Sequence, residues 1–140
     1  MMNINDCTPW REGEYAQFSS SENRCTHIAN NPQQKHIRQF KVDGEVFPYG
    51  TNPRRCDYLL LDDTGQQSYY IELKGSDVLT AIAQIETTIS LISPSIKNYG
   101  ILCRIVYRTA THELNGSEVI RWKRRRRGAI IKSVRLEETI

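Results

Sequence analysis

The chain has 140 residues, of which 39% are hydrophobic and 25% charged, and its formal net charge is +3 at pH 7. This length and composition suit one globular domain over residues 1–140 with a core of modest size. They exclude a membrane-spanning helix, which needs roughly 18 consecutive apolar residues. The N-terminal residues also lack the basic start and apolar stretch of a signal peptide. We therefore expect a cytoplasmic protein with no membrane partner.

The first 36 residues are polar and weakly periodic, and residues 1–20 are expected to be largely irregular. Thr8-Pro9 is typical of a helix start, because proline is tolerated at the first helical position. Residues 20–27 suit a second short turn of helix. The alternation from His36 to Val42 predicts a strand that ends at the turn signal Asp43-Gly44.

Residues 57–74 predict a β-hairpin. Tyr58-Leu59-Leu60-Leu61 and Tyr69-Tyr70-Ile71 are the aromatic and apolar runs of buried strands, and Asp62-Asp63-Thr64-Gly65 between them is a turn signal. Charged residues nevertheless stand at the strand ends, where Asp57 begins the first strand and Glu72 and Lys74 close the second. Buried charges are costly unless something compensates them, so these three residues call for an explanation.

A long helix follows the hairpin at once. Ser76 or Asp77 is expected to cap it and Pro94 to end it. Its apolar residues recur in steps of three and four, at Val78, Ile82, Ile85, Ile89 and Ile92.

The rest of the chain predicts a strand at 101–106, broken only by Arg104, and a C-terminal unit at 117–140. This unit comprises a basic helix that Ser117 caps and Gly128 stops, followed by a final strand over 129–134. The element order α-β-β-β-α-β-α-β predicts an α/β fold with a mixed central sheet flanked by helices.

The expected hairpin register brings the acids together. With Thr64-Gly65 as a two-residue turn, Asp57 lies directly opposite Glu72, and Lys74 shares the face of Glu72. Two opposed carboxylates repel, and a divalent cation between them reverses the sign of that interaction; hard oxygen ligands suit Mg²⁺, for which Mn²⁺ can substitute. This is the arrangement that metal-assisted phosphodiester hydrolysis requires, with the lysine stabilising charge or orienting the nucleophile. An ordinary Glu–Lys pair at a solvent-facing hairpin end is the alternative.

One flank of the long helix adds to the candidate site. Asp77, Ala81, Gln84 and Thr88 follow each other at helical spacing beside the apolar stripe. We expect this flank to form a wall of the cleft, with Gln84 able to hydrogen-bond a phosphate or a metal-bound water. A boundary between core and solvent is the alternative.

These motifs resemble the PD-(D/E)XK nuclease superfamily, which has the restriction-endonuclease-like fold. The residues that carry the resemblance are Lys41-Val42-Asp43-Gly44, Arg55-Cys56-Asp57-Tyr58, Ile71-Glu72-Leu73-Lys74-Gly75-Ser76-Asp77 and Ala83-Gln84-Ile85, which are similar to small bacterial and phage-borne members. The resemblance covers roughly residues 20–105. It implies an αβββαβ core, Mg²⁺-dependent cleavage of DNA, Asp57 and Glu72 as metal ligands and Lys74 as the catalytic lysine. One departure is that Cys56 stands where the family has a proline.

Members of the superfamily often add an acidic residue from the first helix. Glu22 is our candidate, with Glu12 and Glu14 as rivals. Asp43 and Glu45 are nearer to the hairpin, but Asp43-Gly44 is equally well explained as a turn. The three histidines, His27, His36 and His112, carry no partner pattern and receive no role.

The positive charge is concentrated near the C-terminus. Residues 1–100 hold 9 Lys/Arg and 12 Asp/Glu, whereas residues 101–140 hold 10 Lys/Arg and 4 Asp/Glu. Such a cluster attracts polyanions by releasing their counterions, although a solvated helix end is the simpler explanation. We expect it to bind nucleic acid through Arg121, Lys123, Arg124, Arg125, Arg126 and Arg127.

The sequence thus predicts a small metal-dependent deoxyribonuclease, acting in phage or plasmid biology or in defence. A catalytically inactive nucleic-acid-binding or regulatory protein with the same fold is the alternative. A chain of 140 residues has little room for a sequence-reading domain. Structure-selective action, a homodimer or a partner protein that supplies specificity would each answer that need. The four scattered cysteines, Cys7, Cys25, Cys56 and Cys103, indicate neither a zinc site nor a disulfide framework.

Overall fold

The computed structural model describes residues 2–109 and 112–140. Its main sheet has the strand order β1-β4-β5-β6-β7-β8. Strands β4 (Ile37–Lys41), β5 (Tyr58–Asp62) and β6 (Gln67–Lys74) form an antiparallel meander. Helix α1 (Val78–Ile92) then returns the chain to β7 (Gly100–Tyr107), which is parallel to β6. The fold is therefore α/β with a mixed sheet.

The remaining elements extend this centre on both sides. At one edge β1 (Arg11–Gly13) pairs antiparallel with β4, and at the other β8 (Ile130–Ser133) pairs parallel with β7. A second sheet has the order β2-β3-β9, made by β2 (Gln17–Glu22), β3 (Cys25–Asn30) and β9 (Arg135–Thr139). Helix α2 (Ser117–Arg125) follows β7, and short 3-10 helices lie at Ile4–Asp6, Ser93–Ser95 and His112–Asn115.

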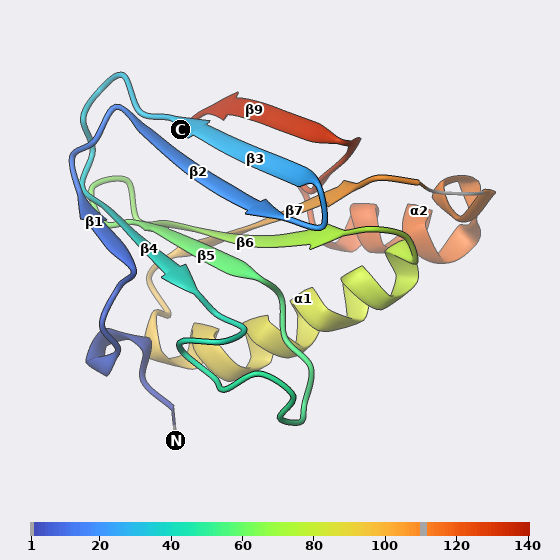
Figure 1. The fold of residues 1–140 in the computed structure, drawn as a ribbon, viewed down its shortest axis with the longest axis horizontal. Helices are drawn as coiled ribbons and strands as arrows, with labels where there is room; N and C mark the ends of the chain where they lie inside the picture. Colours follow the sequence, from blue (N-terminus) through green and yellow to red (C-terminus); the bar gives the residue numbers. More distant parts are fainter. Residues whose placement is uncertain (1, 110–111) are drawn as a thin grey trace.

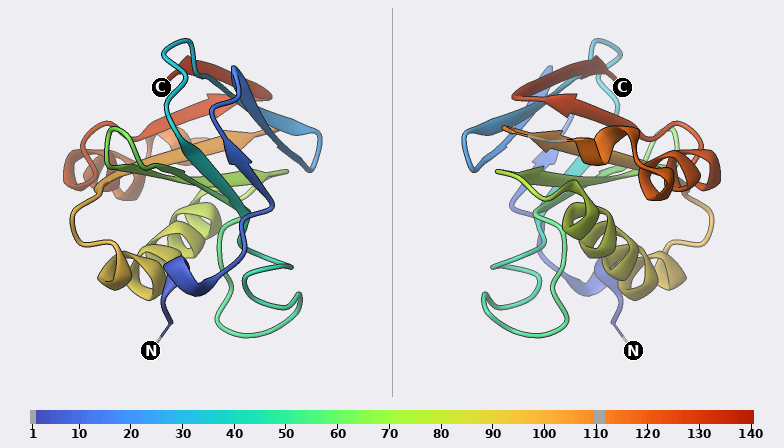
Figure 2. Two further views of the ribbon diagram at one scale, coloured as in Figure 1. Left: turned by 90° about the vertical axis from the view of Figure 1, so that its left-hand side faces the viewer. Right: turned by 90° about the vertical axis from the view of Figure 1, so that its right-hand side faces the viewer.

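The molecule is built in three layers. The second sheet covers one face of the main sheet, and α1 and α2 lie against the other (Figures 1 and 2). The side chains alternate accordingly, so that Leu59 and Tyr70 pack toward the helices whereas Leu60 and Tyr69 pack toward the second sheet. The expected mixed sheet is confirmed, but helices cover only one of its faces, because the second sheet covers the other.

Helix α1 confirms its prediction closely. Asp77 is the N-cap, and its side chain accepts a hydrogen bond from the Thr80 backbone N–H at 3.1 Å. The helix ends at Ile92, just before Pro94. Four residues of the predicted apolar stripe are buried against the main sheet: Val78, Ile85, Ile89 and Ile92. The fifth, Ile82, is only partly buried, and Ala81 is buried beside the stripe.

The hairpin has the predicted register but a different turn. Tyr58 pairs with Ile71 and Asp62 with Gln67, so that Asp57, one residue beyond, lies opposite Glu72. A four-residue loop, 63–66, replaces the two-residue turn. The Asp62 carboxylate accepts the Gly65 N–H inside this loop, and a wider loop leaves the strand pairing unchanged.

The N-terminal third differs from expectation. Within residues 2–36 there is no α-helix: the segment after Thr8-Pro9 leads into β1, and residues 20–27 belong to the β2–β3 hairpin. The leading helix of the expected αβββαβ core is therefore missing there. These strands were not predicted because two of their buried residues are polar and look like surface residues in the sequence. Ser20 accepts a hydrogen bond from the Gln39 side chain, and His27 is hydrogen-bonded to Glu138. Both partners are distant in sequence.

Two details at the C-terminus also differ. Gly116, not Ser117, is the N-cap residue of α2, and it makes no side-chain hydrogen bond. The expected final strand over 129–134 is β8, and it is followed by β9, which crosses to the second sheet. Val134 adopts a positive φ of 63° between these two strands. In the described part of the chain no helix is long and apolar enough to cross a membrane.

Candidate active site

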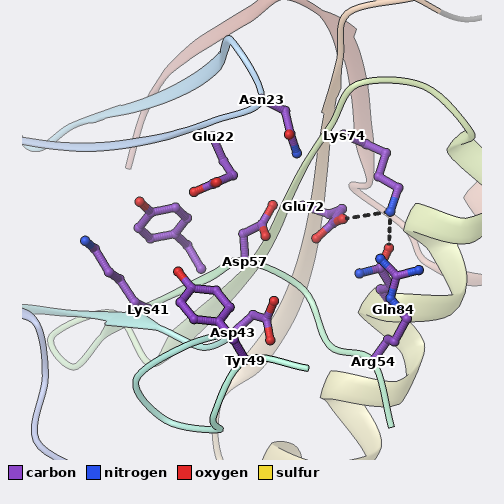
Figure 3. Close-up of a pocket in the computed structure, with 11 residues that line it drawn as sticks. Glu22, Asn23, Lys41, Asp43, Tyr49, Arg54, Asp57, Glu72, Lys74 and Gln84 are labelled. Atoms are coloured by element: carbon purple, nitrogen blue, oxygen red, sulfur yellow. Dashed lines mark hydrogen bonds and ion pairs between the residues drawn. The ribbon is translucent and has the colours of Figure 1, made fainter. Parts of the chain in front are cut away.

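A polar cleft of ≈ 210 Å³ opens where β5 begins and β6 ends (Figure 3). It lies between the β2–β3 turn and the loop that joins β4 to β5. The five residues predicted from the sequence to take part in catalysis all line it: Glu22, Asp57, Glu72, Lys74 and Gln84. The cleft therefore brings together four separate segments of the chain.

Asp57 and Glu72 form the centre of the cleft. The Asp57 backbone N–H donates to the Ile71 carbonyl at 3.2 Å, which continues the β5–β6 pairing to the acids. One Asp57 carboxylate oxygen, Oδ2, accepts the Leu73 N–H at 2.9 Å. Glu72 is only 2% exposed, and its Oε1 has no hydrogen-bond partner. A buried carboxylate oxygen without a donor is costly, so this atom is available to a ligand.

The electrostatics of the pair oppose full ionisation. Burial raises the pKa of Glu72 well above its ordinary value, and the neighbouring Asp57 carboxylate raises it further. Burial also raises the pKa of Asp57; the Leu73 N–H opposes this shift and the Glu22 charge adds to it. The two carboxyl groups therefore retain a proton between them unless a cation compensates their charge.

Lys74 projects into the cleft beside the acids. Its Nζ lies 3.7 Å from Glu72 Oε2 and donates to Gln84 Oε1 at 2.7 Å. The other end of the Gln84 amide, Nε2, donates to the Arg55 carbonyl at 3.0 Å. Gln84 thus fixes the lysine, and both ends of its amide are already engaged. Each end of an amide can make a second hydrogen bond, so contact of Gln84 with a phosphate or a metal-bound water stays a prediction.

The rest of the helix flank does not line the cleft. Asp77 caps α1, Ala81 packs in the core and Thr88 is buried, so the expected wall is reduced to Gln84. Thr88 explains why Cys56, and not a proline, precedes Asp57. Its Oγ1 accepts the Cys56 backbone N–H at 2.8 Å, a hydrogen bond that proline cannot donate. The position before Asp57 is therefore held by a hydrogen bond instead of a ring.

Glu22 reaches the cleft from a strand end, not from a helix. It ends β2, and the turn residues Asn23 and Arg24 have positive φ values of 51° and 58°. The Asn23 side chain donates to the Leu73 carbonyl at 2.8 Å, which fixes this turn against the strand that carries Glu72. The position of Glu22 was predicted from the sequence, but the element that delivers it was not.

The alternative acids have other partners. Glu12 and Glu14 both contact His36, at 2.7 and 3.4 Å, at the β1 edge. Asp43 lines the cleft, whereas Glu45 does not. His27 is buried against Glu138, and the His112 side chain lies outside the described residues.

Four cleft residues that carry positive charge or an aromatic ring were not among the predicted site residues: Lys41, Tyr49, Arg54 and Tyr58. Lys41 ends β4 opposite Tyr58, so the strand-end pattern that revealed Glu72 also marked it. Arg55 holds the loop that carries Tyr49 and Arg54. Its guanidinium is buried, donates to the Pro48 and Thr51 carbonyls and stacks on the Phe47 ring at 4.6 Å.

The donor set suits a hard cation with few protein ligands. Among residues 2–109 and 112–140, no group of three or more His, Cys, Asp or Glu side chains is close enough together to hold a metal ion. Mg²⁺ typically keeps several waters and binds through one or two carboxylates, whereas zinc needs three or four protein ligands. The orphaned Glu72 Oε1 and the mutual repulsion of the acids fit Mg²⁺ or Mn²⁺.

The arginine cluster lies elsewhere. None of Arg121, Lys123, Arg124, Arg125, Arg126 and Arg127 lines the cleft. They belong to α2 and the residues after it, where Arg126 donates twice to Glu86 of α1, at 2.7 and 2.8 Å. Glu86 and Gln84 point to different flanks of α1, so the helix separates the cluster from the acids.

Comparisons with family models, with curated proteins and with solved structures find no match for this chain.

Proposed function

We propose that the protein is a Mg²⁺-dependent nuclease that hydrolyses DNA phosphodiester bonds, of the PD-(D/E)XK type. The observation that carries the proposal is the buried acid pair with an unpartnered Glu72 oxygen, in a polar cleft beside a fixed lysine. Strongly shifted carboxyl pKa values in a cleft are typical of functional sites.

The five cleft residues predicted from the sequence each have a role in this proposal. Asp57 and Glu72 hold the cation, which when bound polarises the phosphate and lowers the pKa of an attacking water. Lys74 stabilises the negative charge that develops on the phosphate, and Gln84 keeps its Nζ in place. Glu22 lies at the rim of the acid pair and is suited to hold a water of the cation's hydration shell.

The order β4-β5-β6-α1-β7, with acids at the β5 and β6 ends, supports this assignment. It corresponds to the βββαβ part of the core that the resemblance implies. The leading helix does not support it, since strands occupy that part of the chain. The proposal therefore rests on the site and on the second half of the core.

The second candidate is a nucleic-acid-binding protein without turnover, and the arginine cluster is the observation in its favour. Five of its six cations are exposed, and only Arg126 is held in an ion pair. Such a surface attracts DNA whether or not the cleft is active. A homodimer or a specificity-giving partner fits either candidate.

Cleavage assays separate the two candidates. With Mg²⁺ or Mn²⁺, the wild type is expected to nick or degrade DNA, and Lys74→Ala to lose activity by roughly 100-fold or more while staying folded. Lys97→Ala is the matched control, because Lys97 lies outside the cleft. Equal activity in Lys74→Ala would overturn the assignment of the lysine. Inertness of the wild type on linear, circular, single-stranded and branched DNA would favour the binding protein.

A further inference from the structure

Two exposed aromatic rings adjoin the cleft. Tyr49 is 72% exposed and lines the cleft directly, and Trp10 is 45% exposed. Large rings usually bury their area when nothing else uses it, so rings left in water beside a polar cleft indicate a ligand with a flat, apolar face.

Lys41 and Tyr58 connect Trp10 with the acids. Lys41 pairs with Tyr58 across β4 and β5, and both line the cleft next to Asp57. The Trp10 ring centroid lies 4.0 Å from Lys41 Nζ and 6.1 Å from the Tyr58 ring. Tyr58 is buried, so it packs beneath this surface, while Lys41 and the exposed Trp10 ring extend it from the acid pair toward the β1 edge of the sheet.

Tyr49 is positioned despite its exposure. Its ring lies against Gly44, whose φ is +117°, and a Cβ on that glycine would come within 2.5 Å of the ring. The loop beneath it is held by the buried Arg55 guanidinium, as described above. One side of the ring is thus seated on the backbone while the rest stays accessible. A ring fixed in this way loses little freedom when a base stacks on it.

Arg54 supplies positive charge on the opposite side of the acids (Figure 3). Cations that follow a phosphate backbone and aromatic rings that accept base faces are the two components of sites for single-stranded nucleic acid. In a duplex the base faces are stacked inside the helix and cannot reach side chains. The chemistry of this surface therefore discriminates between paired and unpaired strands.

We propose that Tyr49, Lys41 and Trp10, with the buried Tyr58 ring beneath them, form a track that binds unpaired nucleotides and leads a single DNA strand to the acid pair. This inference rests on the proposed nuclease function and adds its substrate class, which is single-stranded DNA or the unpaired arms of frayed and branched DNA. The strand lies with its bases on the rings and its phosphates toward Lys41, Arg54 and the cation site.

The test measures binding apart from turnover. In the Glu72→Gln background, which cannot complete the metal site, fluorescence anisotropy gives Kd for a labelled oligothymidylate and for a blunt hairpin duplex. The single strand is expected to bind more tightly. Tyr49→Ala and Trp10→Ala should each weaken it by about 5- to 100-fold, the usual range for loss of one base–ring stack. Tyr49→Phe and Trp10→Phe, which keep a ring, should bind nearly as the parent does.

Ile120→Ala is the matched control, because it truncates a side chain that is 43% exposed on α2, away from the cleft. Its Kd is expected to stay unchanged. A second readout comes from tryptophan fluorescence, since Trp122 is buried and Trp10 is the exposed one of the two tryptophans. Oligothymidylate should quench this emission in the parent but not in the Trp10→Phe variant.

The outcomes separate this inference from the proposed function. Strand binding that depends on both rings, with no cleavage by the wild type, would keep the track and overturn the nuclease. Cleavage by the wild type, with equal affinity for strand and duplex and no effect of either alanine variant, would keep the nuclease and overturn the track.

Discussion

Two glutamates of this protein, the buried Glu72 and the partly buried Glu138, are in opposite electrostatic states. Glu138, on β9, accepts hydrogen bonds from Arg104 Nε at 2.7 Å and from Arg104 Nη2 at 3.0 Å. Its Oε2 is also hydrogen-bonded to His27 Nε2 at 2.7 Å. Burial by itself raises the pKa of Glu138, but the hydrogen bonds from His27 and Arg104 outweigh it and lower the pKa to about 2. Glu72 has one lysine at 3.7 Å, an adjacent acid and an unpartnered oxygen.

The difference shows that the charge of Glu138 has a structural role, whereas that of Glu72 does not. Glu138 and Arg104 join β9 to β7, and His27 adds β3, so this group fixes the second sheet on the first. All three side chains stabilise the fold together. The Asp57–Glu72 pair does the reverse, because its charges repel inside the protein. A fold retains such an arrangement where a ligand offsets it, and substitutions at the two glutamates should therefore have opposite effects on stability.

The largest effect is expected for Glu138→Ala. Removing this carboxylate leaves the Arg104 charge buried without its partner, which typically costs roughly 3–5 kcal/mol. Urea unfolding of the variant and the wild type measures the loss. Glu137→Ala, one residue earlier on β9 and facing solvent, is the matched control and should change little. Equal stability of the two variants would show that the Arg104–Glu138 pair does not hold the sheets together.

The next largest effect on stability is expected from metal binding. Mg²⁺ or Mn²⁺ that binds only the folded state stabilises it by about 2.7 kcal/mol at one hundred times its Kd. The melting temperature of the wild type is expected to rise with millimolar metal. Glu72→Gln should remove this rise, whereas Glu137→Gln should keep it. A wild type that melts at the same temperature with and without metal would contradict the proposed site.

Without metal, Glu72→Gln should stabilise the protein, and the gain should depend on pH. The folded-state pKa of Glu72 is raised above its unfolded value, so the folded protein binds more protons and loses stability as pH rises through that range. The variant lacks this loss, and the glutamine amide can donate to Asp57. We expect a gain of about 1 kcal/mol at pH 8 that shrinks toward pH 5.

The Glu138 group should show the opposite dependence. Its pKa is lowered to about 2, so its contribution is complete above the unfolded value of about 4.3 and is lost as pH falls toward 2. Unfolding curves in urea between pH 3 and 9 measure both trends, with Glu138→Gln and Glu72→Gln as the reference variants. A Glu72→Gln gain that is independent of pH would contradict the raised pKa of Glu72.

The smallest effect on stability is expected in the arginine cluster. There, too, a paired charge, Arg126, stands beside charges that have no ion-pair partner among the described residues. Replacing the exposed Arg124, Arg125 and Arg127 with glutamine should leave the fold intact, since the two residue types have similar helix propensities. If these arginines contact phosphates, the slope of log affinity for duplex DNA against log salt flattens by about 0.9 for each contact removed. Arg126 is kept, because it holds Glu86. An unchanged slope would make the cluster a solvated face.

The hairpin shows how much of the fold can be predicted from the sequence alone. Two continuous apolar runs around one turn signal were enough to pair Asp57 with Glu72, because the centre of the turn fixes which residues of the two strands face each other. The loop could be wider than expected without consequence for that pairing. Helix α1 was equally predictable, since its cap, its stripe and its terminating proline all lie within one short segment.

The N-terminal strands were not predictable in this way. Ser20 and His27 look like surface residues in sequence, yet both are buried, because Gln39 and Glu138 supply their hydrogen bonds from other elements. The same reason hid the element that carries Glu22, which is a strand end and not a helix. The arginine cluster is the reverse case, since its charge was evident but its place beyond α1 was not.

By itself the sequence determined the local pairings: the register of the hairpin, the bounds of α1 and the common face of Asp57, Glu72 and Lys74. These depend on side chains within a few residues of one another or on a single turn. Only the tertiary structure decided that Glu22, Lys41, Tyr49 and Arg54 surround the acids. It also decided that Arg104 and His27 balance the charge of Glu138, whereas the environment of Glu72 opposes its ionisation. Those outcomes depend on contacts between distant segments, which set the burial, the hydrogen bonds and the charge around each group.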